Sequence, residues 1–315
     1  MSRFVVCGET LIDLVRVAEP SDDHFRTTWQ ALSAGGPMNT AVALSRLEAD
    51  SHFLGRLSRD AFGRQLHDHL TGAGVDLDLA VITDQATSLA VVELDADGVA
   101  SYTFHFDGTA NFAWQPPELP ELGAGDWLHI ASLACVVEPG AGVLLDWASA
   151  SQAPLSYDIN VRPTVITDPK LYWTKVEPWL ELAGRNGGIV KASDADLAAL
   201  AEVAPGGADP AETAALWQQR YGLRAVVITL GPGGAVAVDA DGRTDVPGRK
   251  VEVVDTVGAG DTFMAGFLDG FVRRQASLED ALRRGVAAAA IVCERQGAQP
   301  PTAAEVDELL RSDAR

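Results

Sequence analysis

Short apolar runs alternate with segments of helical periodicity along most of this chain. The apolar runs predict buried strands, and the helical spacing of residues 39–49 and 60–73 predicts helices between them. This alternation predicts a parallel sheet with helices on both faces. We expect its strands at Phe4–Cys7, residues 52–55, Trp127–Ile130, Leu155–Ile159, Gly188–Lys191 and Ala225–Leu230, a hairpin beginning with Val236–Asp239, and the last long helix at Leu278–Cys293.

The region 76–115 has a different pattern. Leu89–Leu94 and Ser101–Phe106 are rich in β-forming residues and flank the turn 95–98, which predicts a hairpin. Together with Leu11–Val17 it predicts a small β-subdomain, built from about residues 11–30 and 86–113 and inserted in a single domain over residues 1–315. This subdomain could be a lid, and its exposed apolar positions would equally suit a dimer surface.

The composition is that of an ordinary globular protein. The 315 residues are 47% hydrophobic, and 24 Lys and Arg stand against 44 Asp and Glu, a net charge of −20. That charge repels nucleic-acid phosphates and anionic lipids, so we expect neither nucleic acid nor a membrane as a partner. Three scattered cysteines and a start without signal-peptide character predict a reducing, cytoplasmic location.

The segment 255–263 carries the strongest chemical signal. It reads Asp-Thr-Val-Gly-Ala-Gly-Asp-Thr-Phe and follows an apolar run, residues 251–254, that predicts a strand. Phenylalanines at helical spacing come next, so we expect a helix to begin near Gly260: Phe263, Phe267 and Phe271.

A helix N-terminus with bare amides binds anions. Gly258, Ala259 and Gly260 would present such amides with almost no side-chain bulk. Asp261, in the first turn, could accept a proton from an attacking hydroxyl while the amides hold phosphoryl oxygens. The alternative is a small-residue turn whose aspartate only suits the helix dipole.

Polar residues elsewhere could complete a site. Asn39 follows two glycines that allow close approach of a ligand, although it could instead be only a helix N-cap. Asp13 could accept hydrogen bonds from hydroxyl groups. Arg162, beyond the end of a predicted strand, is a candidate phosphate clamp or, alternatively, a surface ion-pair partner. The sequence has no P-loop, H-E-x-x-H or G-x-S-x-G pattern.

Taken together, these motifs resemble the phosphofructokinase-B, or ribokinase-like, family of sugar kinases from Gly8 to Pro300. The C-terminal signature D-T-x-G-A-G-D-x-F is matched in full at 255–263, and the N-terminal G-G-x-x-x-N is met at 34–39 with Ala34 as its first position. The resemblance implies a Rossmann-type three-layer α/β/α sandwich with a β-sheet lid, and a homodimer joined through that lid.

The resemblance also implies roles for individual residues. Asp261 would be the catalytic base and residues 258–260 the anion hole, while the candidate clamp Arg162 would hold phosphoryl charge. The implied sugar-binding residues are Asp13, Gly35, Gly36, Asn39, Tyr102, Phe104, His105, Asp158 and Asn160. The implied ATP-binding residues are Lys191, Ser193, Thr229, Gly231, Gly234 and Val286.

Two metal ions are implied as well. Asp196 would face the water shell of Mg²⁺, and K⁺ would lie near Asp255, Val257 and Gly297. Besides Ala34, four positions depart from the family pattern: Ser193 in place of Asn, Asp196 in place of Glu, Val286 in place of Asn and Pro301 in place of Ser.

Shorter sequence segments bear on the identity of the acceptor sugar. The segment 36–39, the aromatic lid strand and D-x-N-x-R at 158–162 look most like fructokinases, which predicts transfer to a primary hydroxyl of a neutral hexose. The alternative is a 2-keto-3-deoxygluconate kinase, which shares D-x-N-x-R. That keto acid needs a fixed cation, and His105 on the lid is only partly charged near neutral pH. A nucleoside kinase and a non-catalytic sugar- or nucleotide-binding pseudokinase remain further alternatives.

Overall fold

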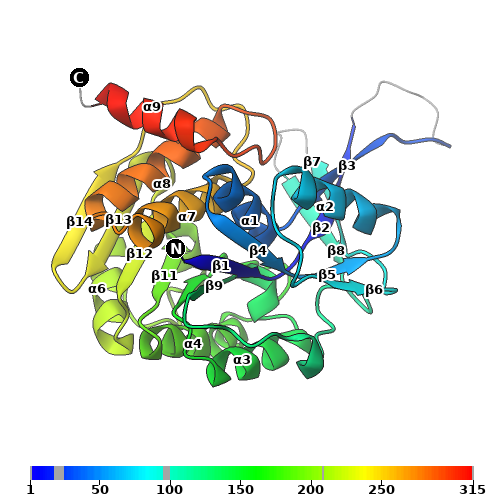
Figure 1. Ribbon diagram of the computed structural model, residues 1–315, viewed down its shortest axis with the longest axis horizontal. Coiled ribbons are helices and arrows are strands. Elements are labelled where there is room, and N and C mark those ends of the chain that lie inside the picture. The colour runs from blue at the N-terminus through cyan, green and yellow to red at the C-terminus, as the bar shows by residue number, and fades with distance from the viewer. Residues whose placement is uncertain (1, 18–24, 95–99, 208, 314–315) are drawn as a thin grey trace.

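The main sheet of this protein has eight strands in the order β14-β13-β12-β11-β10-β9-β1-β4 (Figure 1). The computed structural model describes residues 2–17, 25–94, 100–207 and 209–313. Six neighbouring strands are parallel, and the hairpin β13–β14 adds an antiparallel edge. The strands are β1 (Arg3–Cys7), β4 (Asp50–Leu54), β9 (Asp126–Ala131), β10 (Leu155–Asp158), β11 (Ile189–Ser193), β12 (Ala225–Thr229), β13 (Gly234–Asp239) and β14 (Gly242–Pro247).

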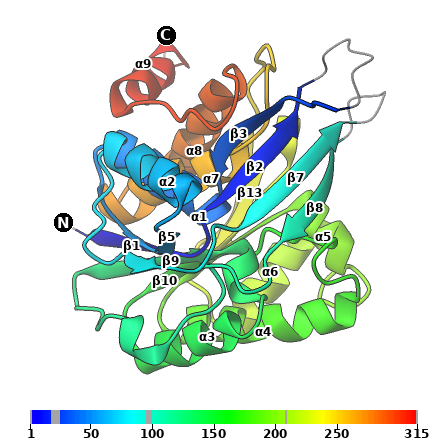
Figure 2. The ribbon, with the colours of Figure 1, turned by 90° about the vertical axis from the view of Figure 1, so that its right-hand side faces the viewer.

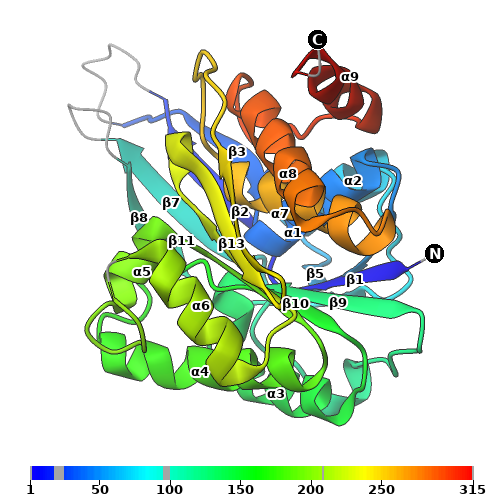
Figure 3. The same cartoon turned by 90° about the vertical axis from the view of Figure 1, so that its left-hand side faces the viewer.

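Helices cover both faces of this sheet, as the alternation of strands and helices predicts (Figure 3). One face packs on α1 (Gly36–Arg46), α7 (Ala259–Leu268) and α8 (Leu278–Cys293), with α2 (Ala61–Gly72) and α9 (Ala303–Asp313) beside them. The other packs on α3 (Gly140–Ala150), α4 (Pro169–Arg185), α5 (Asp194–Leu200) and α6 (Pro210–Tyr221). In the part of the chain that the structure describes, none of the helices combines the length and apolar character needed to cross a bilayer.

The two hydrophobic cores follow from the period of a strand. In β1, Phe4 and Val6 contribute to the core under α1, α7 and α8, whereas Val5 and Cys7 contribute to the core over α3, α4 and α6. Successive side chains of a strand point to opposite faces, so an uninterrupted apolar run fills both cores.

A separate sheet of four strands stands beside the main one (Figure 2). Its order is β3-β2-β7-β8, and β2 pairs with both β3 and β7. The hairpin β7–β8 is the predicted one, although its turn at 95–98 lies outside the described residues. The strands are β2 (Leu11–Arg16), β3 (Trp29–Ala34), β7 (Leu89–Leu94) and β8 (Ala100–His105), and β5 (Arg56–Ser58) and β6 (Val81–Thr83) form a small pair of their own.

The start of α1 differs from the sequence prediction. The helix begins at Gly36 with Gly35 as its N-cap, so Asn39 lies inside the first turn and is not the cap. Pro37 explains the earlier start, because a proline in the first turn has the right backbone angle and its missing N–H costs no helical bond.

The strand predicted at residues 251–254 is wrong. Val253 and Val254 are 60% and 61% exposed, and the N–H of Val254 donates to the carbonyl of Cys293 (2.8 Å) at the end of α8. The segment therefore caps a helix instead of pairing with a strand. The sequence prediction also missed β3 and α9.

Candidate active site

A cavity of about 560 Å³ lies between the carboxyl ends of the main strands and the four-stranded sheet. The direction in which strands are added to the sheet reverses here. After β1, the chain places β4 on one side of it and the later strand β9 on the other side. Glu9 follows β1 and Ser132 follows β9, and both line the cavity. Open α/β sheets bind ligands at this kind of switch point, so the topology itself indicates a ligand site.

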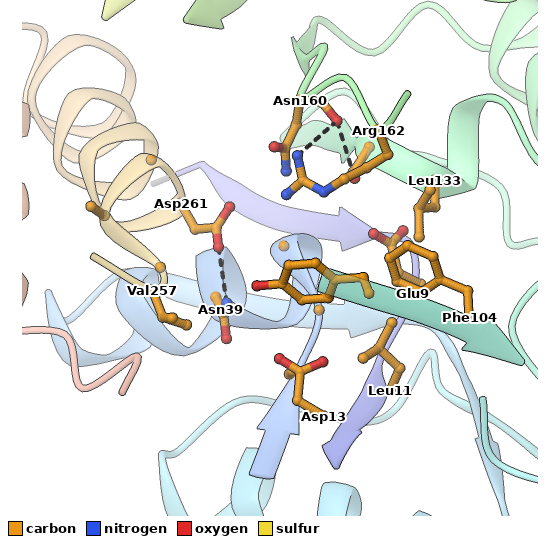
Figure 4. Close-up of a pocket in the computed structure, with 18 of the residues that line it drawn as sticks. Glu9, Leu11, Asp13, Asn39, Phe104, Leu133, Asn160, Arg162, Val257 and Asp261 are labelled. Atoms are coloured by element: carbon orange, nitrogen blue, oxygen red, sulfur yellow. Dashed lines mark hydrogen bonds between the residues drawn. The ribbon is translucent and has the colours of Figure 1, made fainter. Parts of the chain in front are cut away.

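The first turn of α7 places Asp261 in the cavity wall (Figure 4). Its Oδ2 accepts a hydrogen bond from Nδ2 of Asn39 (2.9 Å), which reaches it from α1. Burial raises the pKa of Asp261, while the Asn39 hydrogen bond and the charges of Lys191 and Arg162 oppose that rise. The arrangement holds a carboxylate with few partners at a helix N-terminus.

Glycines keep the space around Asp261 open. A Cβ on Gly36 would lie 3.2 Å from Asp261 Oδ1 and 3.2 Å from Asn160 Nδ2. Gly258 is the N-cap of α7 at a φ of +76°, and a Cβ there would lie 2.7 Å from Cβ of Ala298. Both positions therefore favour glycine. At Gly36 a side chain would fill the space beside Asp261, and at Gly258 the positive φ at the start of the helix suits a residue without Cβ.

The predicted anion hole is only partly free. The N–H of Ala259 donates to the carbonyl of Thr256 (3.2 Å), so this amide is already engaged. Gly258 and Gly260 line the cavity beside Asp261, and α7 presents the positive end of its dipole there. The geometry therefore fits an anion next to the carboxylate of Asp261.

Arg162 extends into the cavity from the loop after β10 (Figure 4). Its guanidinium donates to the carbonyls of Val161 (3.0 Å) and Asn160 (3.4 Å). Burial raises the pKa of the carboxyl groups that line the cavity, and the charge of Arg162 partly opposes that rise. Asp13 of β2 lies in the same cavity, and its burial raises its pKa to about 6. The surface ion-pair interpretation of Arg162 is therefore wrong, since the side chain faces an internal space.

Sequence reasoning missed Glu9. The side chain is 2% exposed, its Oε2 accepts the N–H of Ala134 (3.1 Å), and burial raises its pKa to about 7. A signal for it existed, because Glu9 comes directly after the first buried strand and Gly8, at the sheet edge where such folds bind ligands.

Lys191 and Asp158 form a buried ion pair under the cavity. They are directly opposite on β11 and β10, and Lys191 Nζ donates to Asp158 Oδ2 (2.8 Å). Burial raises the pKa of Asp158 to about 6 although Lys191 opposes it. Burial would lower the pKa of Lys191, but the carboxylates of Asp158 and Asp196 outweigh it, so the ammonium stays charged.

Two of the predicted sugar-binding residues, Asp158 and His105, are not among the described residues that line this cavity. Asp158 is buried behind Lys191 and serves as its counter-ion. His105 lines a neighbouring hollow that shares Tyr102 and Phe104 with the cavity. The remaining predicted sugar residues meet in the cavity: Asp13, Gly35, Gly36, Asn39, Tyr102, Phe104 and Asn160.

Most of the residues predicted for ATP lie at adjoining strand ends beside the cavity. Lys191 and Ser193 belong to β11, and Thr229 ends β12 opposite Ser193. Gly231 lies in the turn after β12 and Gly234 begins β13, and the described cavity lining includes Lys191 but not the other four. Val286 is 7% exposed and belongs to the hydrophobic core, and its implied contact with adenine stays a prediction.

Ser193 and Asp196 form a capping box at the start of α5. Asp196 Oδ2 accepts from the N–H and hydroxyl of Ser193 (2.7 and 2.8 Å), and Oδ1 accepts from the N–H of Val161 (2.7 Å). The carboxylate is therefore committed to the fold and lies outside the cavity lining, contrary to the implied contact with the water shell of Mg²⁺.

The three residues predicted for a monovalent cation do come together. Asp255 Oδ1 accepts the N–H of Val257 (3.0 Å) and Oδ2 accepts the N–H of Gly297 (2.8 Å). One carboxylate thus ties the loop before α7 to the loop after α8, beside the anion hole. Carboxylate and carbonyl oxygens of such loops are suitable ligands for a hard cation.

Known proteins match this chain over nearly all of its length. The pfkB family of carbohydrate kinases matches residues 1–305. A fructokinase from Rhizobium leguminosarum bv. trifolii is 36% identical over 292 residues, which cover 89% of this chain and 85% of that protein.

Solved structures share the fold. The fructokinase from Xylella fastidiosa with bound ATP has a TM-score of 0.85 at 26% identity and covers 99% of both chains. A double mutant of the fructokinase from Vibrio cholerae O395, in a form with fructose, ADP and potassium ion bound, has a TM-score of 0.83 at 27% identity and covers 98% of both chains. The predicted ribokinase-like α/β/α sandwich is confirmed, and the chain belongs to the pfkB family of carbohydrate kinases.

Proposed function

We propose that this protein is an ATP-dependent fructokinase, which transfers the γ-phosphoryl group of ATP to a primary hydroxyl of fructose. The observation that carries the proposal is Asp261, a buried carboxylate with one side-chain hydrogen bond, next to glycine amides at the start of α7 and open to a cavity. The similarity to the Rhizobium leguminosarum fructokinase supports the choice of fructose.

The chemistry follows from the residues around that carboxylate. The acceptor hydroxyl donates its proton to Asp261 as its oxygen forms a bond to the γ-phosphorus. The bond from that phosphorus to the bridging oxygen breaks, and ADP leaves with the electron pair. Amides of the first turn of α7 and the guanidinium of Arg162 hold negative charge on the phosphoryl oxygens.

The four-stranded sheet would act as a lid in this reaction. Leu11 and Asp13 of β2 and Phe104 of β8 form one wall of the cavity, so movement of this sheet would exclude water from the reacting groups. We also propose that this sheet joins a homodimer, since Trp29 and Leu32 on its edge strand β3 are 37% and 45% exposed. Light scattering of wild type and Leu32→Glu tests the dimer, because a charge in that contact should yield monomers.

Two metal ions belong to the proposal in different ways. Asp255, Val257 and Gly297 would hold K⁺, which would neutralise charge beside the anion hole. Mg²⁺ would arrive with the phosphates of ATP, because Asp196 is committed to its capping box and does not fit the role implied for it. The free cysteines Cys7, Cys135 and Cys293 support the proposed cytoplasmic location.

A 2-keto-3-deoxygluconate kinase is the second candidate function. Arg162 supplies a fixed cation inside the cavity, which suits the carboxylate of a keto acid. His105 lines a neighbouring hollow that shares Tyr102 and Phe104 with the cavity, so the argument for the keto acid rests on Arg162.

The test is ADP production with Mg-ATP and K⁺ across fructose, 2-keto-3-deoxygluconate, ribose, glucose and adenosine, with Asp261→Asn as the control for contaminating kinases. We expect turnover with fructose far above that with the other acceptors. A preference for the keto acid would replace the proposed substrate but keep the catalytic group. Absence of turnover with every acceptor, despite ATP binding, would contradict the kinase assignment and support the pseudokinase.

A further inference from the structure

A second cavity lies outside the proposed active site, where the last turns of α1 and α2 meet the loop of residues 295–300 that follows α8 (Figure 1). Its volume is about 360 Å³, which falls within the range of small-molecule sites. Among the described residues, its lining has no member in common with that of the active-site cavity. A ligand held here would therefore bind apart from the reacting groups.

Basic side chains outnumber acidic ones in this second cavity. Arg46, His69 and Arg295 line it, and Asp68 is the one carboxylate among its described lining residues. Asp68 Oδ1 also lies 3.3 Å from Nδ1 of His67, which is outside that lining. The whole chain has 44 Asp and Glu against 24 Lys and Arg. A local excess of positive charge in so acidic a protein indicates an anion as the ligand.

The two arginines differ in what engages them. Arg46 is exposed, and within the described chain its guanidinium has neither a hydrogen bond nor an ion pair. Arg295 donates through Nη1 to the carbonyls of Gln299 (3.2 Å) and Pro300 (3.4 Å). Its Nη2 donates to Glu305, which fixes the side chain in the cavity wall. A guanidinium presents five N–H donors in a planar fork that matches phosphate oxygens, so the cavity offers one fixed fork and one free one.

The rest of the lining indicates the organic part of the ligand. Apolar side chains form one part of the wall: Val42, Ala73, Ala298 and Pro300. Val42 is 3% exposed and Pro300 is buried, so this part of the wall is packed against the protein. A phosphate monoester with a small apolar group would bind its oxygens to the guanidinium groups and rest its carbon atoms on this wall, which an inorganic ion would leave uncovered.

The loop that carries Arg295 also forms part of the proposed K⁺ site. The N–H of Gly297 donates to Asp255 Oδ2 (2.8 Å), and a Cβ on Gly258 would lie 2.7 Å from Cβ of Ala298. Ala298 also lines the second cavity. A ligand that holds Arg295 therefore holds the loop that contacts the start of α7.

We propose that this cavity is a regulatory site for a small phosphate monoester, which Arg46 and Arg295 bind, and that the bound ligand strengthens K⁺ binding on the other side of the loop. The regulatory part of this inference rests on the proposed function, whereas the binding site does not. A ligand that binds one arrangement of the loop more tightly than others shifts the loop toward it. Such coupling is reciprocal, so K⁺ must tighten binding of the phosphate monoester by the same factor.

Calorimetry with phenyl phosphate tests the site, using the full chain with fructose and a non-hydrolysable ATP analogue bound so that the active site is occupied. We expect Arg46→Gln to weaken binding by about tenfold or more, because a charge-assisted hydrogen bond is lost. Arg64→Gln, on the exposed surface of α2 outside the cavity lining, is the matched control and should bind phenyl phosphate as wild type does. Arg46→Gln should unfold at the wild-type temperature, since Arg46 has no partner within the described residues.

Three results would contradict the site. Absence of binding to wild type, or equal binding by wild type and Arg46→Gln, would overturn it and leave Arg46 as a solvated surface residue. Tighter binding of succinate than of phenyl phosphate would overturn the choice of phosphate over carboxylate. Equally tight binding of inorganic phosphate would overturn the role of the apolar wall.

A second measurement tests the coupling to K⁺. Saturating phenyl phosphate should lower the K⁺ concentration that gives half-maximal phosphorylation of fructose by about fivefold or more. In calorimetry, replacement of K⁺ by tetramethylammonium should weaken binding of phenyl phosphate by the same factor. Equal affinity in the two buffers would overturn the regulatory inference. Failure of the wild type to phosphorylate any acceptor would count against the proposed function alone, because the calorimetric result does not require turnover.

Discussion

Two buried aspartates, at either end of one continuous helical segment, have opposite surroundings. Asp261 lies in the first turn of α7, and its side chain receives one hydrogen bond, from Asn39. Asp269 begins the π-helical turn Asp269–Arg273 that follows α7, and it is fully buried. Three arginines donate to its carboxylate: Arg273, Arg274 and Arg284.

We propose that the difference separates a carboxylate that reacts from one that holds the fold. Asp269 has ion-pair partners on both oxygens, and through Arg284, which also pairs with Asp307, it joins the π-helical turn to α8 and α9. Asp261 keeps lone pairs toward a cavity, and burial raises its pKa. Incomplete pairing next to open space, more than burial or charge, thus distinguishes the proposed catalytic group.

The comparison predicts that Asp261→Asn removes activity and spares the fold. We expect kcat to fall by about 10²–10⁴-fold, because the base and its negative charge are lost together. Fructose affinity, measured by calorimetry, should change little, and the melting temperature should stay the same or rise, since a poorly paired buried charge is gone. A variant with wild-type turnover would remove Asp261 from its catalytic role.

Asp269→Asn should do the reverse. Loss of this charge leaves buried Arg284 without one of its partners, so we expect the free energy of unfolding to fall by about 3–5 kcal/mol in denaturant titrations. The kcat of the folded fraction should stay within about twofold of wild type. Glu279→Gln, which breaks an exposed pair with Arg283, is the matched control and should cost about 0.5 kcal/mol or less. Equal losses in the two variants would contradict the special place of Asp269.

Glu9 tests whether the cavity carboxyls as a group are poorly paired. Burial raises the pKa of Glu9 from 4.5 to about 7, so the folded state keeps a proton that the unfolded chain releases at lower pH. Between these two pH values the folded state binds more protons than the unfolded chain. The stabilisation that protonated Glu9 gives the folded state is therefore complete below pH 4.5 and is lost as the pH rises through 7.

The measurement is the difference in unfolding free energy between wild type and Glu9→Gln across this range. The stability of wild type relative to the variant should fall by about 3 kcal/mol between pH 4.5 and pH 8. Because the other groups titrate in both proteins, the difference isolates Glu9. A difference that does not vary with pH would show that Glu9 is well paired, as Asp269 is.

The local pattern of apolar and polar residues predicted much of the fold. Apolar runs predicted the buried strands, because a strand packed on both faces needs little beyond hydrophobic side chains. The pattern failed where contacts with distant residues decide whether a segment becomes a strand. Val253 and Val254 have β-forming side chains but no strand beside them, whereas β3 pairs with β2 despite a largely exposed, irregular pattern. Helix α9 did carry a missed signal, the capping box of Thr302 and Glu305.

The site residues also divide into those that local sequence predicts and those that only the fold brings together. Asp261 and its glycines are contiguous in sequence, so their chemistry could be predicted from the segment alone. The Asp158–Lys191 pair could not, because strand register places two residues 33 positions apart opposite each other. The position of His105, in a hollow next to the cavity, also depends on how the hairpin stands against the main sheet, which no motif specifies.

Asn39→Ala gives the smallest of the expected effects and tests the single hydrogen bond that distinguishes Asp261. That bond lowers the pKa of Asp261 against the effect of burial, so its loss should move the acid limb of the kcat profile to higher pH. We expect kcat on the acid limb to fall by about tenfold, the scale of one hydrogen bond to a charged group, and the deficit to narrow on the plateau above that limb. A deficit of constant size across the pH range would instead assign Asn39 to sugar binding alone, and then Asp261 would owe its reactivity to burial and not to a tuned partner.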